Sequence, residues 1–129
     1  MFPENYAMKQ MIKKTLESRE IFFYCDFHGH SRARNMFMYG CNNTIKDRKL
    51  KERIFPYIFS QHSENFSFEN CSFAIQKSKE TTARVVMHRE FSLINSFTCE
   101  CSFLGPNKGF YKDCHFSISM FLELGKEFC

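Results

Sequence analysis

Hydrophobic and polar positions follow two different periods in the first thirty residues. In residues 5–18, apolar side chains recur at helical spacing with lysines between them, at Met8, Met11, Ile12 and Leu16. This pattern predicts an amphipathic helix. Residues 21–27 then form a nearly continuous apolar run of strand length. Such a run is typical of an interior strand covered on both faces, so the pair indicates an α/β layer architecture.

The middle of the chain carries weaker patterns. Residues 42–53 are polar and charged, which predicts a loop or an exposed helix, and residues 54–59 form a short apolar helical stretch that Pro56 interrupts. Strand or edge positions follow around a turn at residues 69–70, namely Phe66, Phe68, Phe73 and Ile75. The β-branched content of residues 82–87 predicts another strand.

The clearest alternation lies in INSFTCECSF, residues 94–103, which Gly105 and Pro106 end. One predicted face carries Phe97, Cys99, Cys101 and Phe103, and the other carries Thr98, Glu100 and Ser102. A last helix is expected over residues 119–128, with Ser117 or Ser119 as its N-cap.

Composition narrows the class of protein. The chain has 129 residues, 17 Phe and 43% hydrophobic content, which favours one folded domain over disorder. The net charge of +4 comes from interspersed basic and acidic residues, and a nucleic-acid-binding surface would need a denser basic cluster. Seven cysteines, an odd number, without an N-terminal leader pattern predict an intracellular protein with reduced thiols. No stretch approaches the roughly 20 apolar residues of a membrane span, so we expect a soluble protein without a membrane partner.

Several side chains are candidates for chemistry. His28 follows the apolar run where that strand should end, which suits a metal ligand, and Asp26 is close enough in sequence to support it. A polar strand end that meets solvent is the simpler interpretation, because an HxH pair is a weak motif. Glu100 lies in a strand with buried neighbours, where a desolvated carboxylate suits a general base. On the pattern alone, an exposed strand face is the slightly favoured interpretation of Glu100.

Two further groups have weaker patterns. A zinc site from Cys99, Cys101, Cys114 and His115 departs from the usual knuckle spacing, and buried thiols are common on apolar strand faces. The basic group Lys77, Lys79 and Arg84 is usually a solvated surface, although beside a cleft it would attract an acidic substrate.

Read together, the motifs have a common meaning. They are FYCDFHGHSRARNMFMYGC, then KSKETTARVVM, then NSFTCECSFLG, then HF followed by LELGKEFC. In this order and spacing the chain, from about residue 21 to residue 129, resembles the C-terminal half of the catalytic domain of the cytosolic carboxypeptidases. This branch of the zinc carboxypeptidase family includes the tubulin deglutamylases. The segments KERIFPYIFS and NFSF look closest to members that trim polyglutamate chains.

The resemblance implies a fold and a set of roles. The fold is a mixed sheet sandwiched between helices, with residues 1–129 as a partial catalytic domain. His28 would be one protein ligand of the catalytic zinc ion (Zn²⁺), and Glu100 the general base that takes a proton from zinc-bound water. Arg84 would pair with the glutamate carboxylate of the substrate. The expected partners are polyglutamylated tubulin or other acidic protein C-termini, and the expected location is cytoplasmic, on microtubules.

The family's remaining zinc ligands are missing from this sequence. They come from an HxxE motif, and none of the five histidines is followed three residues later by Glu. The family's Asn-Arg pair for the terminal carboxylate has no counterpart either. One histidine cannot form the three-ligand site that zinc catalysis needs, so this chain alone should not hydrolyse peptides. We therefore expect a fragment of a complete metallocarboxypeptidase, with a non-catalytic remnant that binds acidic peptide tails as the alternative.

Overall fold

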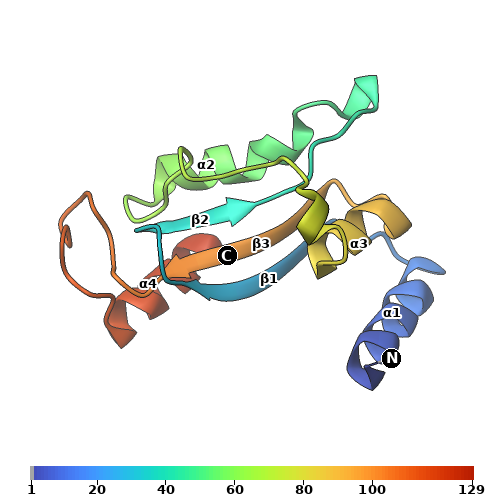
Figure 1. Ribbon diagram of the computed structural model, residues 1–129, viewed down its shortest axis with the longest axis horizontal. Helices are drawn as coiled ribbons and strands as arrows, with labels where there is room; N and C mark the ends of the chain where they lie inside the picture. Colours follow the sequence, from blue (N-terminus) through green and yellow to red (C-terminus); the bar gives the residue numbers. More distant parts are fainter. Residues whose placement is uncertain (1) are drawn as a thin grey trace.

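The protein is a mixed three-stranded sheet with helices on both faces (Figure 1). This computed structural model describes residues 2–129. The strands are β1 (Phe23–His30), β2 (Met36–Tyr39) and β3 (Asn95–Ser102), in the spatial order β1-β3-β2. β3 is parallel to β1 and antiparallel to β2. The expected α/β class, a mixed sheet between helices, is confirmed.

The described residues also form four α-helices. They are α1 (Pro3–Leu16), α2 (Ile54–His62), α3 (Ala83–Phe91) and α4 (Ile118–Phe128). Three single-turn 3₁₀ helices, η1 (Lys46–Arg48), η2 (Lys51–Arg53) and η3 (Lys77–Lys79), lie in the connections. Within residues 2–129 no helix is both long and apolar enough to cross a membrane.

The two faces of the sheet differ because side chains alternate along each strand. The apolar face carries Met36, Met38, Phe97 and Cys99, and these pack with Phe59 of α2 and Leu124 of α4 into the main core. On the opposite face, α3 supplies Met87 to a smaller cluster with Ile12 of α1 and Leu93. α1 reaches away from the body and touches it mainly through this cluster (Figure 1).

The helix predictions at the two ends of the chain are confirmed. α1 starts at Pro3, whose fixed φ and missing N–H suit a first helical turn. α4 is capped by Ser117, whose Oγ accepts a hydrogen bond from the Met120 N–H at 3.3 Å. In α2, Pro56 does not interrupt the helix, because it occupies the first turn, where a free N–H has no intrahelical partner.

Two strand predictions are wrong. Residues 82–87 are not a strand: from Ala83 onward they form α3, whose residues Arg84, Val85 and Met87 are buried against the rest of the molecule. Packing on one helical face therefore outweighs the weak β preference of the two valines. β1 is not an interior strand either, because it lies at the edge of the described sheet, although both its faces are partly covered near Phe23 and Tyr24.

The middle of the chain differs from expectation in detail. The positions around Phe66 and Ser72 make only isolated bridges to Met36 and Tyr39 rather than a strand. β2 itself was not predicted, since it is only four residues long. Residues 42–53 form the turns η1 and η2, in agreement with a loop or exposed helix.

Candidate functional site

The site begins with the register of β1 and β3. His28 is paired with Glu100, and Asp26 with Thr98, across the two parallel strands. Paired residues project from the same face, so the alternation in each sequence brings the two predicted groups together. On the other side of β3, Tyr39 of β2 is paired with Thr98. The result is a polar face on the side of the sheet opposite the main core.

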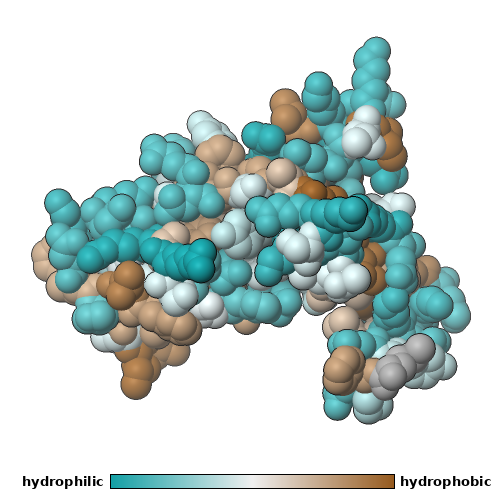
Figure 2. Space-filling model, viewed as in Figure 1, coloured by the Kyte–Doolittle hydropathy of each residue, from teal (hydrophilic) through white to brown (hydrophobic). Residues whose placement is uncertain are grey.

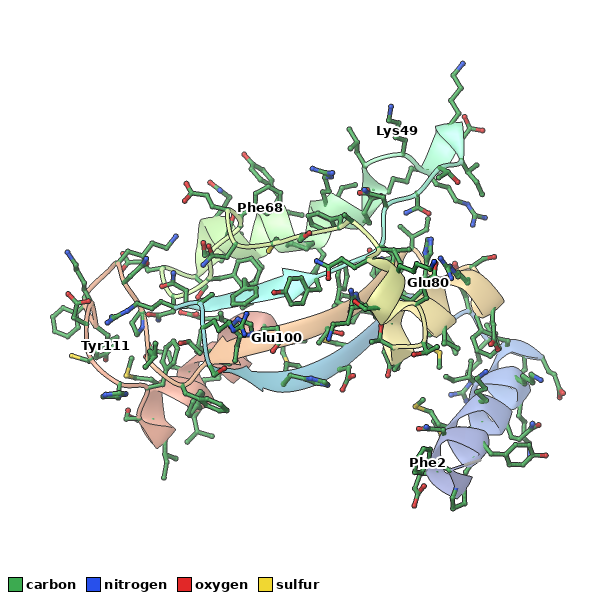
Figure 3. The ribbon with its side chains drawn as sticks, viewed as in Figure 1. Phe2, Lys49, Phe68, Glu80, Glu100 and Tyr111 are labelled. Atoms are coloured by element: carbon green, nitrogen blue, oxygen red, sulfur yellow. The ribbon has the colours of Figure 1, made fainter. Side chains whose placement is uncertain are left out.

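A cavity of about 550 Å³ opens on this polar face. Its walls include all three residues for which the sequence predicted a role, His28, Arg84 and Glu100, together with Asp26, His30 and Lys79. Arg84 reaches it from the first turn of α3, and Lys79 from η3. Figure 3 shows Glu100 on β3 near the middle of the molecule. The predicted residues therefore share one cavity, while their roles stay predictions.

Glu100 is the buried acid of this cavity. Only 8% of its surface is exposed, so the simple interpretation that its strand face is open to solvent is wrong. Its Oε2 lies 3.7 Å from Nδ1 of His30, a residue that is also mostly covered. The carboxylate is thus held among polar groups at the edge of a cavity, an environment in which it can accept a proton from a bound water molecule.

Tyr39 lies close enough to Glu100 and Arg84 for their charges to affect its pKa. Burial, followed by the negative charge of Glu100, raises the pKa of the Tyr39 phenol, and the nearby Arg84 opposes this shift. The phenol is therefore a neutral hydrogen-bond donor at physiological pH. The sequence patterns do not identify Tyr39 as a site residue, because β2 is too short to show a strand pattern. The segment FMYG, which contains Tyr39, is the signal that could have found it, since it is part of the family resemblance.

The side chain of His28 is half-exposed and lies against Asp26. Its Nε2 lies 2.9 Å from Oδ2 of Asp26, two residues earlier on the same face of β1. Asp26 therefore lies beside His28, while its expected role in supporting a metal ligand stays a prediction. The exposure of His28 agrees with a polar strand end that meets solvent. Within residues 2–129, no three side chains of His, Cys, Asp or Glu are grouped so that they could hold a metal ion.

The lack of a metal-binding group within residues 2–129 also removes support for the alternative zinc site, which would use Cys99, Cys101, Cys114 and His115. Cys99 is buried on the apolar face of the sheet, whereas Cys114 is exposed and the His115 ring bonds to the carbonyl of Phe103 at 3.2 Å. These residues are not grouped as metal ligands within the described part of the chain.

Arg84 is the most unusual residue of the cavity. Only 6% of its surface is exposed, yet its hydrogen-bond acceptors are neutral: the Gly40 carbonyl and the Thr82 hydroxyl, each at 3.4 Å. Its guanidinium also lies over the Tyr39 ring, 5.5 Å from the centroid. No carboxylate of residues 2–129 forms an ion pair with it. A buried cation without an anion is costly, so Arg84 is well placed to receive a ligand carboxylate.

Comparison with known proteins gives the following relatives. No protein-family model matches the chain. It is 46% identical over 129 residues to cytosolic carboxypeptidase 2 of Mus musculus, and 46% identical over 129 residues to that of Homo sapiens. It is 42% identical over 133 residues to cytosolic carboxypeptidase 3 of Mus musculus. Each alignment covers 99% of this chain, but the chain spans only 15%, 14% and 13% of these relatives, respectively.

The fold has a solved counterpart. A crystal structure of a metallo-carboxypeptidase from Burkholderia cenocepacia superposes with a TM-score of 0.67 at 16% identity, over 91% of this chain and 31% of that one. The resemblance to the cytosolic carboxypeptidases that the sequence indicated is confirmed by these similarities.

Proposed function

We propose that this chain, which is homologous over almost its whole length to a segment of the cytosolic carboxypeptidases, forms part of a metallocarboxypeptidase catalytic domain. The complete domain would be a zinc-dependent hydrolase that removes glutamate from acidic protein chains. Polyglutamylated tubulin is the partner we propose, in the cytoplasm and in association with microtubules. Residues 1–129 would be the C-terminal half of that domain.

One observation carries the proposed substrate class. Arg84 is a buried guanidinium without an acidic partner in the described chain, and it lines the same cavity as Glu100. A side-chain carboxylate of the substrate would supply the missing charge, and the planar fork of arginine can bind it through two hydrogen bonds. Lys79 lines this cavity too and increases its attraction for acidic residues.

Glu100 would act as the general base. Its carboxylate is buried at the cavity wall, so a water molecule bound there could pass a proton to it as the water attacks the scissile carbonyl. Tyr39, whose phenol stays protonated, offers a donor on the same side of the sheet.

Residues 2–129 do not fit a catalytic zinc site by themselves. Such a site needs three protein ligands and an open position, and His28 is the single ligand we propose from this chain. We therefore assign no step through the metal to these residues. Hydrolysis belongs to the complete domain, and a non-catalytic remnant that binds acidic tails through Arg84 is the alternative function.

Binding of a labelled tri-glutamate peptide tests the substrate class. We expect the chain, fused to a solubility tag, to bind this peptide more tightly than tri-glutamine. Arg84→Met should weaken tri-glutamate binding about 10- to 100-fold, because a charge-assisted hydrogen bond of about 1.5–3 kcal/mol is lost. Arg19→Met, which removes an exposed arginine outside the cavity, is the matched control.

Two measurements protect this test from a folding artefact. The thermal unfolding of each variant identifies a destabilised Arg84→Met protein, and Arg84→Lys retains the charge while losing the planar fork. Equal affinity of the unaltered chain for tri-glutamate and tri-glutamine would refute the proposal without reference to any variant.

A further inference from the structure

Tyr39 lines the 550 Å³ cavity from the end of β2. It is in register with Thr98, two residues before Glu100 on β3. Figure 2 shows hydrophilic side chains over the middle of the molecule, where Figure 3 places Glu100. Burial, followed by the charge of Glu100, raises the pKa of the Tyr39 phenol, and Arg84 lowers it. Tyr39 is therefore within electrostatic reach of both groups to which the proposed function gives a role.

Residues 39 and 40 together hold the side chain of Arg84. The guanidinium carbon lies over the Tyr39 ring, 5.5 Å from its centroid, where a cation is attracted by the face of the ring. Nε donates a hydrogen bond to the Gly40 carbonyl at 3.4 Å, and Nη1 donates one to the Thr82 hydroxyl at 3.4 Å. Within residues 2–129, Nη2 forms no hydrogen bond, so the guanidinium keeps a free donor for a ligand.

The Tyr39 ring is held in place by its own strand. Phe37, two residues earlier on the same face and only 1% exposed, packs edge-on against it, with ring centroids 5.5 Å apart and an interplanar angle of 82°. Gly40 follows, and a Cβ there would lie only 2.7 Å from the Phe73 ring. Glycine thus lets the backbone after Tyr39 approach Phe73 closely while its carbonyl bonds to Arg84.

The hydroxyl of Tyr39 is available to a ligand. The side chain is partly buried and lines the cavity, and its oxygen forms no hydrogen bond within the described residues 2–129. Because the phenol stays protonated at physiological pH, it offers an O–H donor. The cavity therefore holds two different donors close together, the phenol of Tyr39 and the guanidinium of Arg84.

We propose that Tyr39 determines the specificity of this cavity for a carboxylate: its ring holds the Arg84 guanidinium, and its hydroxyl donates a hydrogen bond to the ligand carboxylate that Arg84 binds. This inference rests on the proposed function for its ligand and extends recognition from one residue to two. A carboxylate accepts at both oxygens and satisfies both donors. The amide of glutamine has one acceptor oxygen, and its NH₂ group would face a donor. Tyr39 and Arg84 together thus reject glutamine more strongly than Arg84 alone.

The ratio of tri-glutamate affinity to tri-glutamine affinity tests this role. It is measured for the tagged chain, for Tyr39→Phe, which loses only the hydroxyl, and for Tyr39→Leu, which also loses the ring. We expect the ratio to fall about tenfold in Tyr39→Phe, because a hydrogen bond to a charged group is lost, and further in Tyr39→Leu, because Arg84 loses its aromatic support. Tyr57→Phe and Tyr57→Leu are the matched controls, since Tyr57 on α2 is 55% exposed and lies outside the cavity.

A fall in the ratio in both Tyr39 variants, with both Tyr57 variants unchanged, supports the inference. An unchanged ratio in Tyr39→Phe overturns it. So does an equal loss of affinity for both peptides, which is what a purely structural role would give. In the Arg84→Met background, Tyr39→Leu should lose no more than Tyr39→Phe, because the ring then has no cation to hold, and a larger loss would refute the role of the ring.

Arg84→Met tests the proposed function separately. If this variant loses the preference for tri-glutamate while the Tyr39 variants keep it, the proposed function stands and the inference fails. If the unaltered chain binds both peptides equally, the proposed function itself fails and the inference falls with it.

Discussion

The thiols of Cys71 and Cys101 illustrate how strongly burial controls single residues in this protein. Both pack against the main core, and burial raises the pKa of each thiol to about 11. Hydrogen bonding to Cys25 and burial also raise the pKa of Cys99. Since the thiolate is the reactive form, these core cysteines should be poor nucleophiles at physiological pH.

We predict that iodoacetamide at pH 8 modifies the exposed Cys114 and Cys129 first. Cys71 and Cys101 should react at least about 100-fold more slowly, because a pKa two units above the usual thiol value lowers the thiolate fraction by that factor. Peptide mass spectrometry over time gives the rate for each site. Similar labelling rates at all four thiols would show that these side chains are not protected.

The raised pKa values of Cys71 and Cys101 also imply that the free energy of unfolding falls as pH rises from about 9 to 11, because the unfolded thiols then lose protons that the folded ones keep.

For single residues, the sequence predicts which face of a strand a side chain lies on better than it predicts whether that face is buried. The alternation in residues 94–103 correctly separated Phe97 and Cys99 from Thr98 and Glu100, because side-chain direction follows directly from strand period. Whether the Glu100 face is covered depends on how α3 and η3 pack beside the sheet, and the alternation within β3 carries no information about that packing. The burial of Arg84 is equally hard to predict, since the β-branched pattern of its segment predicts a strand and the segment forms α3.

Among the elements, α4 has two local features whose effect on stability can be tested by substitution, a glycine inside the helix and a serine N-cap. Gly125 lies within the helix, and a Cβ added there would meet no atom within 4 Å. We predict that Gly125→Ala stabilises the protein by about 0.5–1 kcal/mol, because glycine loses more backbone entropy in a helix. Ser117→Ala should have the opposite effect, a loss of about 1 kcal/mol, since the Met120 N–H loses its cap. Denaturant unfolding measures both, and a destabilised Gly125→Ala variant would contradict this account of α4.

The elements that the sequence missed were those decided by tertiary contacts. α3 contains two adjacent valines, yet its buried side chains share a helical face, and the Ser96 hydroxyl and Cys41 thiol both bond to the Arg84 carbonyl. β2 is short and is held by β3 and by isolated bridges rather than by its own pattern. In contrast, α1 and α4 had strong periodicity or capping residues and were predicted within a few positions.

For the molecule as a whole, the open edge of β1 is the main hazard. Phe27 on this strand is 62% exposed, and Phe22 and Phe103 beside it are also exposed. An uncovered strand edge with apolar side chains can pair with another chain, so we predict that the isolated 129-residue protein self-associates.

Light scattering during size-exclusion chromatography measures this association. Phe27→Lys should shift the protein toward monomer, because a charge on an edge strand opposes pairing. Phe110→Lys is the matched control, since Phe110 is 88% exposed in the connection between β3 and α4. A monodisperse unaltered chain with one cooperative melting transition would show that the edge is harmless.

The pairing of His28 with Glu100 also limits how this segment can change over evolution. The two residues project from one face only because β1 and β3 keep their present alignment. Loss of a single residue inside either strand, between its anchored core positions and the site, would turn one of the two side chains toward Phe97 and Met38. Substitutions can therefore accumulate along both strands, whereas insertions and deletions of one residue would separate the acid from the histidine at once. Length variation among descendants of this sequence should accordingly concentrate in the connections between strands and helices.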